Sequence, residues 1–155
     1  MRRAVCLILV FLAFSSTVCA ESQMSAEAVS EIIRRAAPAD FGYVDNTEYA
    51  MQRDFAVLSF VDDSCIVVCA ESTNFSEFGV FHVKNEKDVR RCERYLQSYL
   101  NDRKAQFESG VIYDVAEYPK FENASVFSVG QFIVYAILDT NQLSSAQKAV
   151  RSCIK

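Results

Sequence analysis

The longest unbroken apolar run outside the N-terminus is QFIVYAILD, which spans Gln131 to Asp139. Its side chains are mostly β-branched, aromatic or bulky, and Gly130 precedes it. This composition is typical of a strand that is covered on both faces. Such a strand lies in the middle of a sheet, so other strands must pair beside it and helices must pack over it.

Polar turns and hydrophobic periodicity divide the rest of the chain into strands and amphipathic helices. Besides the central strand, we predict strands at Ile66 to Glu71, Glu77 to Lys84 and Asn123 to Val129. We predict helices over residues 26–37 and 86–108 and after Asn141. Asp62-Asp63-Ser64 is interpreted as a turn, residues 39–53 as a loop with a short helical turn, and residues 111–119 as a connector.

Each pair of predicted strands forms a hairpin that is followed by a helix, which gives the element order α-β-β-α-β-β-α. Hairpins of this kind build antiparallel sheets. We therefore expect an α+β fold of the two-layer sandwich type, with an antiparallel sheet of about four strands and helices on one face.

The N-terminus has the three regions of a secretory signal peptide. Positive charge in Met1 to Arg3 is followed by an apolar run from Ala4 to Phe14 and by small residues before Glu21. The apolar run is too short for a membrane span of about 20 residues. We predict a signal peptide over residues 1–20, cleavage between Ala20 and Glu21, and a single domain over residues 21–155.

A second interpretation makes Cys19 the lipidated N-terminus of a membrane-anchored protein. Lipoprotein cleavage normally requires Gly, Ala or Ser before the cysteine, and Val18 stands there instead, so simple cleavage is favoured. Both interpretations place the protein outside the cytoplasm, either secreted or in the extracytoplasmic cell envelope. The membrane would be a partner only through lipidation at Cys19.

Composition fits one folded domain and argues against nucleic acid as a partner. Apolar residues make up 51% of the 155 residues, which is enough for one compact core. Without the leader, 14 basic and 20 acidic residues remain, so the mature chain carries a charge of −6. Nucleic-acid affinity comes largely from neutralising phosphates, which a chain of this charge does not favour.

Export also changes the interpretation of the cysteines, because secreted proteins commonly contain disulfides. The mature chain keeps Cys65, Cys69, Cys92 and Cys153. Cys92 and Cys153 lie on the buried stripes of two helices that we expect on the same face of the sheet. We predict a disulfide between them, which would stabilise the fold by about 4 kcal/mol on the chain-entropy model. The alternative is two buried free thiols.

Few residues in the chain suggest catalytic chemistry. Cys65 and Cys69 are about 13 Å apart if both lie on one strand, too far for a direct bond. The single histidine, His82, has no recognisable nucleophile motif beside it. We predict no catalytic residue, no metal site and no cofactor. The alternative is a thiol-dependent redox or hydrolytic enzyme that uses Cys65 or Cys69 with His82.

Aromatic side chains gather in and after the connector, at Tyr113, Tyr118 and Phe121. Rigid rings bury area at low entropy cost, so such a group can form a binding surface. The competing interpretation is that these rings cap the edge of the sheet.

The strand SEFGVFHVK, the long helix with RKAQF, and the run FENASVFSVGQFIVYAIL resemble the bacterial domain of unknown function 4358. The resemblance covers about residues 49–155. Arg103, Gln106 and Phe107 match a late-helix feature of that family, and Gly130 matches its hairpin glycine. The sequence departs from the family at His82, where lysine is usual, and in lacking a Tyr-x-Pro at Tyr113.

The resemblance implies a small exported chain or lipoprotein of a Gram-positive bacterium and brings no known activity. We therefore expect a secreted or envelope domain that is not an enzyme and acts as a binding or interaction module for an unknown protein or envelope component. The alternatives are the thiol-dependent enzyme and a structural accessory domain.

Overall fold

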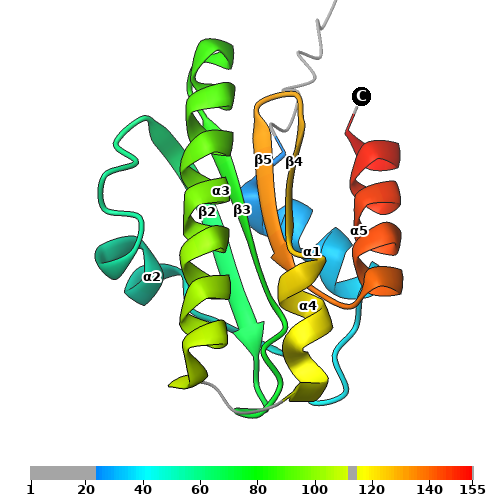
Figure 1. The fold of residues 1–155 in the computed structure, drawn as a ribbon. Helices are drawn as coiled ribbons and strands as arrows, with labels where there is room; N and C mark the ends of the chain where they lie inside the picture. Colours follow the sequence, from blue (N-terminus) through cyan, green and yellow to red (C-terminus); the bar gives the residue numbers. More distant parts are fainter. Residues whose placement is uncertain (1–23, 112–114, 155) are drawn as a thin grey trace, which may run out of the picture.

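The computed structural model describes residues 24–111 and 115–154, and these form an antiparallel sheet of five strands with the order β1-β2-β3-β5-β4 (Figure 1). The apolar run forms β5, which pairs with β3 on one side and with β4 on the other. The strands are β1 (Tyr43–Asp45), β2 (Val61–Cys69), β3 (Glu77–Val83), β4 (Ser125–Val129) and β5 (Phe132–Ile137). The predicted α+β class with an antiparallel sheet is confirmed.

Helices cover both faces of this sheet. They are α1 (Ala26–Ala36), α2 (Thr47–Arg53), α3 (Val89–Gln106), α4 (Tyr118–Glu122) and α5 (Thr140–Cys153). In Figure 1, α3 crosses in front of the strands, whereas α1 lies behind β4 and β5 and α5, which contacts α1, stands to their right. Side chains of β5 alternate between the two layers: Val134 packs with α1 and α5, and Tyr135 packs with α3. The sandwich therefore has three layers instead of the expected two.

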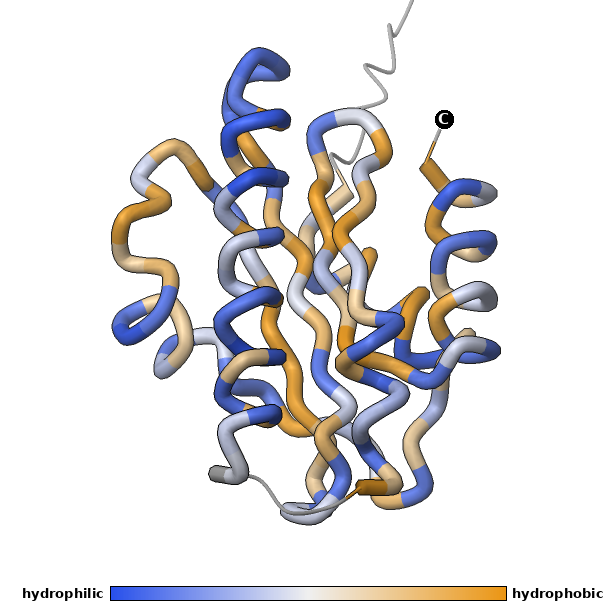
Figure 2. The backbone as a smooth tube through the Cα atoms, viewed as in Figure 1, coloured by the Kyte–Doolittle hydropathy of each residue, from blue (hydrophilic) through white to orange (hydrophobic). Residues whose placement is uncertain are grey.

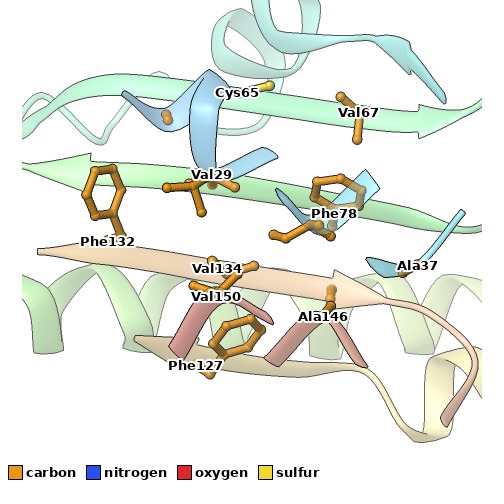
Figure 3. Packing of buried hydrophobic residues seen from close by; sticks show 14 of the residues in the cluster. Val29, Ala37, Cys65, Val67, Phe78, Phe127, Phe132, Val134, Ala146 and Val150 are labelled. Atoms are coloured by element: carbon orange, nitrogen blue, oxygen red, sulfur yellow. The ribbon is translucent and has the colours of Figure 1, made fainter. Parts of the chain in front are cut away.

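The two differences from the expected fold have physical reasons. Every residue of β3 and β5 is buried, because apolar side chains point to both faces and each face needs a covering layer. Pairing of α1 with α5 supplies the second layer, and Figure 3 shows Val29 of α1 and Val150 of α5 over the strands. The fifth strand is β1, part of a predicted loop, which pairs with β2.

The Asp62-Asp63-Ser64 segment is not the predicted turn but part of β2. A bulge between Val61 and Asp63 interrupts the pairing of β2 with β3. The Asp63 carboxylate accepts a hydrogen bond from the backbone N–H of Ala26 at 2.7 Å, at the first residue of α1. An acidic group at a helix N-terminus is favourable, so these turn-like residues attach α1 to the sheet.

Packing between α3 and the sheet requires a glycine in the central strand. Gly79 faces Tyr135 of β5 across the β3–β5 pair, and the Tyr135 ring is fully buried. A Cβ atom added at Gly79 would lie 2.4 Å from Tyr135 Cε1. The missing side chain at Gly79 makes room for the tyrosine ring. In Figure 2 the strands behind α3 are largely hydrophobic, whereas α3 itself is largely hydrophilic.

We predict that Gly79→Ala lowers the free energy of unfolding by about 1–3 kcal/mol, because the Tyr135 ring must move in a packed core. Urea unfolding measures the loss, and the near-ultraviolet circular dichroism of tyrosine reports the displaced ring. Gly42→Ala is the comparison, since no atom lies within 4 Å of its added Cβ and only its φ of 74° opposes the change. An unchanged tyrosine spectrum in Gly79→Ala would contradict this packing.

Candidate functional site

A buried carboxylate lies between the sheet and α3. Glu77, the first residue of β3, is 7% exposed. Its Oε1 accepts hydrogen bonds from the hydroxyls of Tyr99 at 2.7 Å and Tyr135 at 2.6 Å. Its Oε2 lies 3.2 Å from a terminal nitrogen of Arg103. We call these four residues the Glu77 network; the donors compensate a charge that would otherwise be costly to bury.

Three elements position the Glu77 network. Tyr99 and Arg103 are four residues apart on α3, so both side chains lie on one face of the helix. Tyr135 comes from β5, and its hydroxyl reaches Glu77 because its ring lies over Gly79. The network therefore fixes the rotation of α3 relative to the sheet.

Both tyrosines of the network act as permanent hydrogen-bond donors at neutral pH. Burial, and next the Glu77 charge, raise the pKa of Tyr135 well above its ordinary value. The same two causes raise the pKa of Tyr99. Tyrosine already has an ordinary pKa of about 10, so both hydroxyls keep their protons and continue to hold the carboxylate.

A cleft of about 510 Å³ opens beside the network, between the end of α2 and the outer side of α3. We call it the α3 cleft. Its lining residues are Arg53, Asp54, Tyr95, Ser98, Tyr99, Asp102, Arg103 and Gln106.

One wall of the α3 cleft is rigidly held. The Tyr95 hydroxyl donates to the backbone oxygen of Asp54 at 2.6 Å. Arg53 makes two bonds to the Asp54 carboxylate, at 2.8 and 2.6 Å. With Tyr99 and Arg103 bound to Glu77, the side chains at positions 95, 99 and 103 form an anchored stripe along α3.

The parallel stripe is Ser98, Asp102 and Gln106, spaced four residues apart on α3, and it is exposed. Within residues 24–111 and 115–154, none of these three side chains makes a hydrogen bond or ion pair. We call them the free stripe. A hydroxyl, a carboxylate and an amide thus line the cleft with unused donors and acceptors.

Arg103 also faces a second, smaller cleft of about 200 Å³ beside the segment that joins β2 to β3. Its Nε is buried and has no hydrogen-bond partner within the described parts of the chain. The sequence resemblance had marked Arg103 and Gln106 as family features, and the structure places both on the α3 cleft. Neither the resemblance nor the sequence pattern identified Glu77 as a site residue, because an acidic residue at the start of a strand has the pattern of a solvent-exposed residue.

His82 is buried and bound to a carboxylate. Its Nδ1 lies 2.7 Å from Asp62 Oδ1, and its ring packs against Phe132 with centroids 4.8 Å apart. The pocket beside it has a volume of about 200 Å³ and is also lined by Met24 and Ser25. An Asp–His pair can orient a general base, but no thiol is hydrogen-bonded to this imidazole among the described residues.

The two cysteines of the enzyme alternative are both buried. The Cys65 thiol donates to Glu27 Oε2 at 2.8 Å. Burial, and then the Glu27 hydrogen bond, raise the pKa of Cys65 to about 11, which keeps the thiol protonated at neutral pH. A protonated thiol is a poor nucleophile.

The predicted disulfide between Cys92 and Cys153 is not formed, and both thiols are free. Cys92 is buried in the layer between the sheet and α3, and burial raises its pKa to about 12. Cys153 is exposed at the end of α5, which packs on the opposite face of the sheet. The expectation failed because the two helices do not share a face.

Of the predicted aromatic surface, the structure describes Tyr118 and Phe121, and these two do not form a continuous exposed patch. Phe121 is a core residue of α4, and only 2% of it is exposed. Tyr118 is half-buried; its ring packs on Phe107 and its hydroxyl donates to Glu108 at 3.1 Å. Tyr113 lies outside the described residues, as do the predicted Ala20–Glu21 cleavage site and Cys19.

Two properties of the described residues, 24–111 and 115–154, limit other kinds of site. They contain no group of three or more His, Cys, Asp or Glu side chains that could hold a metal ion. None of their helices is long and apolar enough to cross a membrane.

We predict that Cys153 alone among Cys65, Cys69, Cys92 and Cys153 reacts rapidly with a thiol reagent in the native protein, because it alone is exposed and the others are buried. Labelling of the other three should become fast only in denaturant. Mass spectrometry after brief alkylation counts the labelled thiols. Rapid native labelling of Cys65, or a mass that reveals a Cys92–Cys153 bond, would contradict this arrangement.

Comparison with known proteins identifies the family of this chain. The model of the domain of unknown function DUF4358 matches residues 46–138, which include the Glu77 network and the α3 cleft. The match stops before α5 and begins after α1 and β1, so it is shorter than the expected 49–155 at its C-terminal end. No curated protein and no solved structure matched. The chain belongs to the DUF4358 family.

Proposed function

We propose that the protein is a non-catalytic binding module of the cell envelope that holds a polar ligand in the α3 cleft. The observation that carries this proposal is the free stripe: Ser98, Asp102 and Gln106 line the cleft without protein partners. A pocket with a few convergent polar groups is the usual form of a ligand site.

Rigidity of the opposite wall supports the same function. Tyr99 and Arg103 are fixed by Glu77, and Tyr95 is fixed by the backbone of Asp54. Groups that are already held in place lose little conformational entropy when a ligand binds. The buried network therefore prepares the α3 cleft for binding without a large rearrangement.

The thiol-dependent enzyme has weaker support. It requires an accessible thiolate close to His82, whereas Cys65 is buried, carries a raised pKa and donates to Glu27. His82 is bound to Asp62 instead. A purely structural accessory role leaves the polar lining of the cleft without a purpose.

Export is the part of the proposal that rests on sequence. The N-terminal pattern is typical of a signal peptide. The acidic charge of the mature chain suits a partner other than nucleic acid. A component of the cell envelope is a ligand source that agrees with the signal-peptide pattern and with the acidic charge.

We predict that Asp102→Ala combined with Gln106→Ala weakens binding to the purified cell-envelope fraction of the natural host by about 5- to 150-fold, since each of the two lost hydrogen bonds contributes about 0.5–1.5 kcal/mol. Co-sedimentation of the purified protein with that fraction measures the affinity.

The matched control is Gln97→Ala with Asn101→Ala. These two residues are also exposed on α3 and four residues apart, and neither lines the α3 cleft. The control pair should retain full binding. Equal affinity of both double variants would refute a ligand site in the α3 cleft.

A further inference from the structure

We infer that the ligand of the α3 cleft is an uncharged, polyhydroxylated molecule of the carbohydrate class, a short saccharide chain. This inference rests on the proposed function and adds the chemistry of the ligand. It follows from the charge, the hydrogen-bonding groups and the dimensions of the cleft.

Charge in the cleft is largely neutralised by the protein itself. Arg53 is bound through two nitrogens to Asp54, and Arg103 is paired with Glu77. Neither arginine is therefore a free cation that could capture a phosphate or carboxylate. Asp102 is the charged group of the cleft with no ion-pair partner among the described residues, and its carboxylate repels anions.

A cationic ligand is disfavoured as well. Asp102 is a single exposed carboxylate, and exposed ion pairs contribute little to binding. The other carboxylate that lines the cleft, Asp54, is already bound to Arg53, so a cation would meet a single free carboxylate. An uncharged ligand is not repelled by the Asp102 carboxylate and does not depend on a single exposed ion pair for its affinity.

The unused hydrogen-bonding groups match neighbouring hydroxyls. The Asp102 carboxylate presents two acceptor oxygens, the Gln106 amide presents a donor and an acceptor, and the Ser98 hydroxyl does both. A hydroxyl group of a sugar donates and accepts in the same way.

The anchored stripe supplies aromatic surface beside these polar groups. Tyr95 and Tyr99 both line the cleft. An aromatic ring offers an apolar face with a polar tip, which suits the apolar C–H face and polar rim of a pyranose ring. A wholly apolar ligand would leave the polar groups of the free stripe unpaired.

The dimensions fit a short chain instead of a single small molecule. Gln106 follows Ser98 by eight positions along α3, so the free stripe is about 12 Å long at the helical rise of 1.5 Å per residue. The cleft volume of about 510 Å³ lies within the usual range for small-ligand sites, about 300–1,000 Å³.

The test is a titration of the purified protein with cellotriose, maltotriose and triacetylchitotriose, each at up to about 10 mM, which detects millimolar Kd values. Trigalacturonate and trialanine serve as anionic and peptide probes of similar length. Amide chemical shifts in NMR spectra locate any binding, and tyrosine fluorescence reports it independently because the chain has seven tyrosines and no tryptophan.

We expect at least one neutral trisaccharide to shift residues of the free stripe, and the Asp102→Ala/Gln106→Ala variant to weaken that binding about tenfold. The Gln97→Ala/Asn101→Ala control should bind normally. Cleft shifts with trigalacturonate or trialanine alone would overturn the saccharide inference and leave the binding module standing. If the envelope fraction binds at the α3 cleft and no neutral trisaccharide does, the saccharide inference also fails. If the Asp102→Ala/Gln106→Ala variant binds the envelope fraction as tightly as the Gln97→Ala/Asn101→Ala control, both proposals fail.

Discussion

Burial of the Glu77 carboxylate is the constraint on which the rest of the α3 layer depends. An uncompensated charge in this position would cost several kcal/mol, so the chain must bring donors to it. Tyr135 from β5 and Tyr99 and Arg103 from α3 meet that requirement. Because the donors on α3 occupy one side of the helix, they also determine which residues face outward. The free stripe lines the α3 cleft as a consequence of how Glu77 is satisfied.

The two helical layers differ in their relation to the family. The region shared with DUF4358 contains the sheet core, α3, α4 and the Glu77 network. Helices α1 and α5 lie outside it, pack against each other and cover the opposite face. The hydrogen bond from Ala26 to Asp63 attaches α1 to β2. We therefore associate the proposed ligand binding with the α3 side and regard the α1–α5 layer as cover for an otherwise exposed apolar face.

Local patterns predicted most of the elements but not their arrangement. The apolar run became β5, and the helix predicted over residues 26–37 became α1, with Ser25 as its N-cap. Sequence periodicity does not state which face of a sheet a helix covers, so the Cys92–Cys153 prediction failed. The pair Asp62-Asp63 was interpreted as a turn because the sequence does not show what the two carboxylates contact. Asp62 binds His82, and Asp63 binds the N-terminus of α1, and both partners are distant in sequence. The free stripe from Ser98 to Gln106 was not predicted, because its significance depends on a cleft that α3 forms with the end of α2.

The most direct test of this account is a double-mutant cycle of Glu77→Gln and Tyr99→Phe, measured by urea unfolding. We predict a coupling free energy of about 1–3 kcal/mol, because the two side chains share a buried, charge-assisted hydrogen bond. The same cycle on Glu108 and Tyr118, whose hydrogen bond of 3.1 Å is exposed to solvent, should give less than about 0.5 kcal/mol. A coupling at Glu77 no larger than at Glu108 would show that the network does not hold α3 on the sheet.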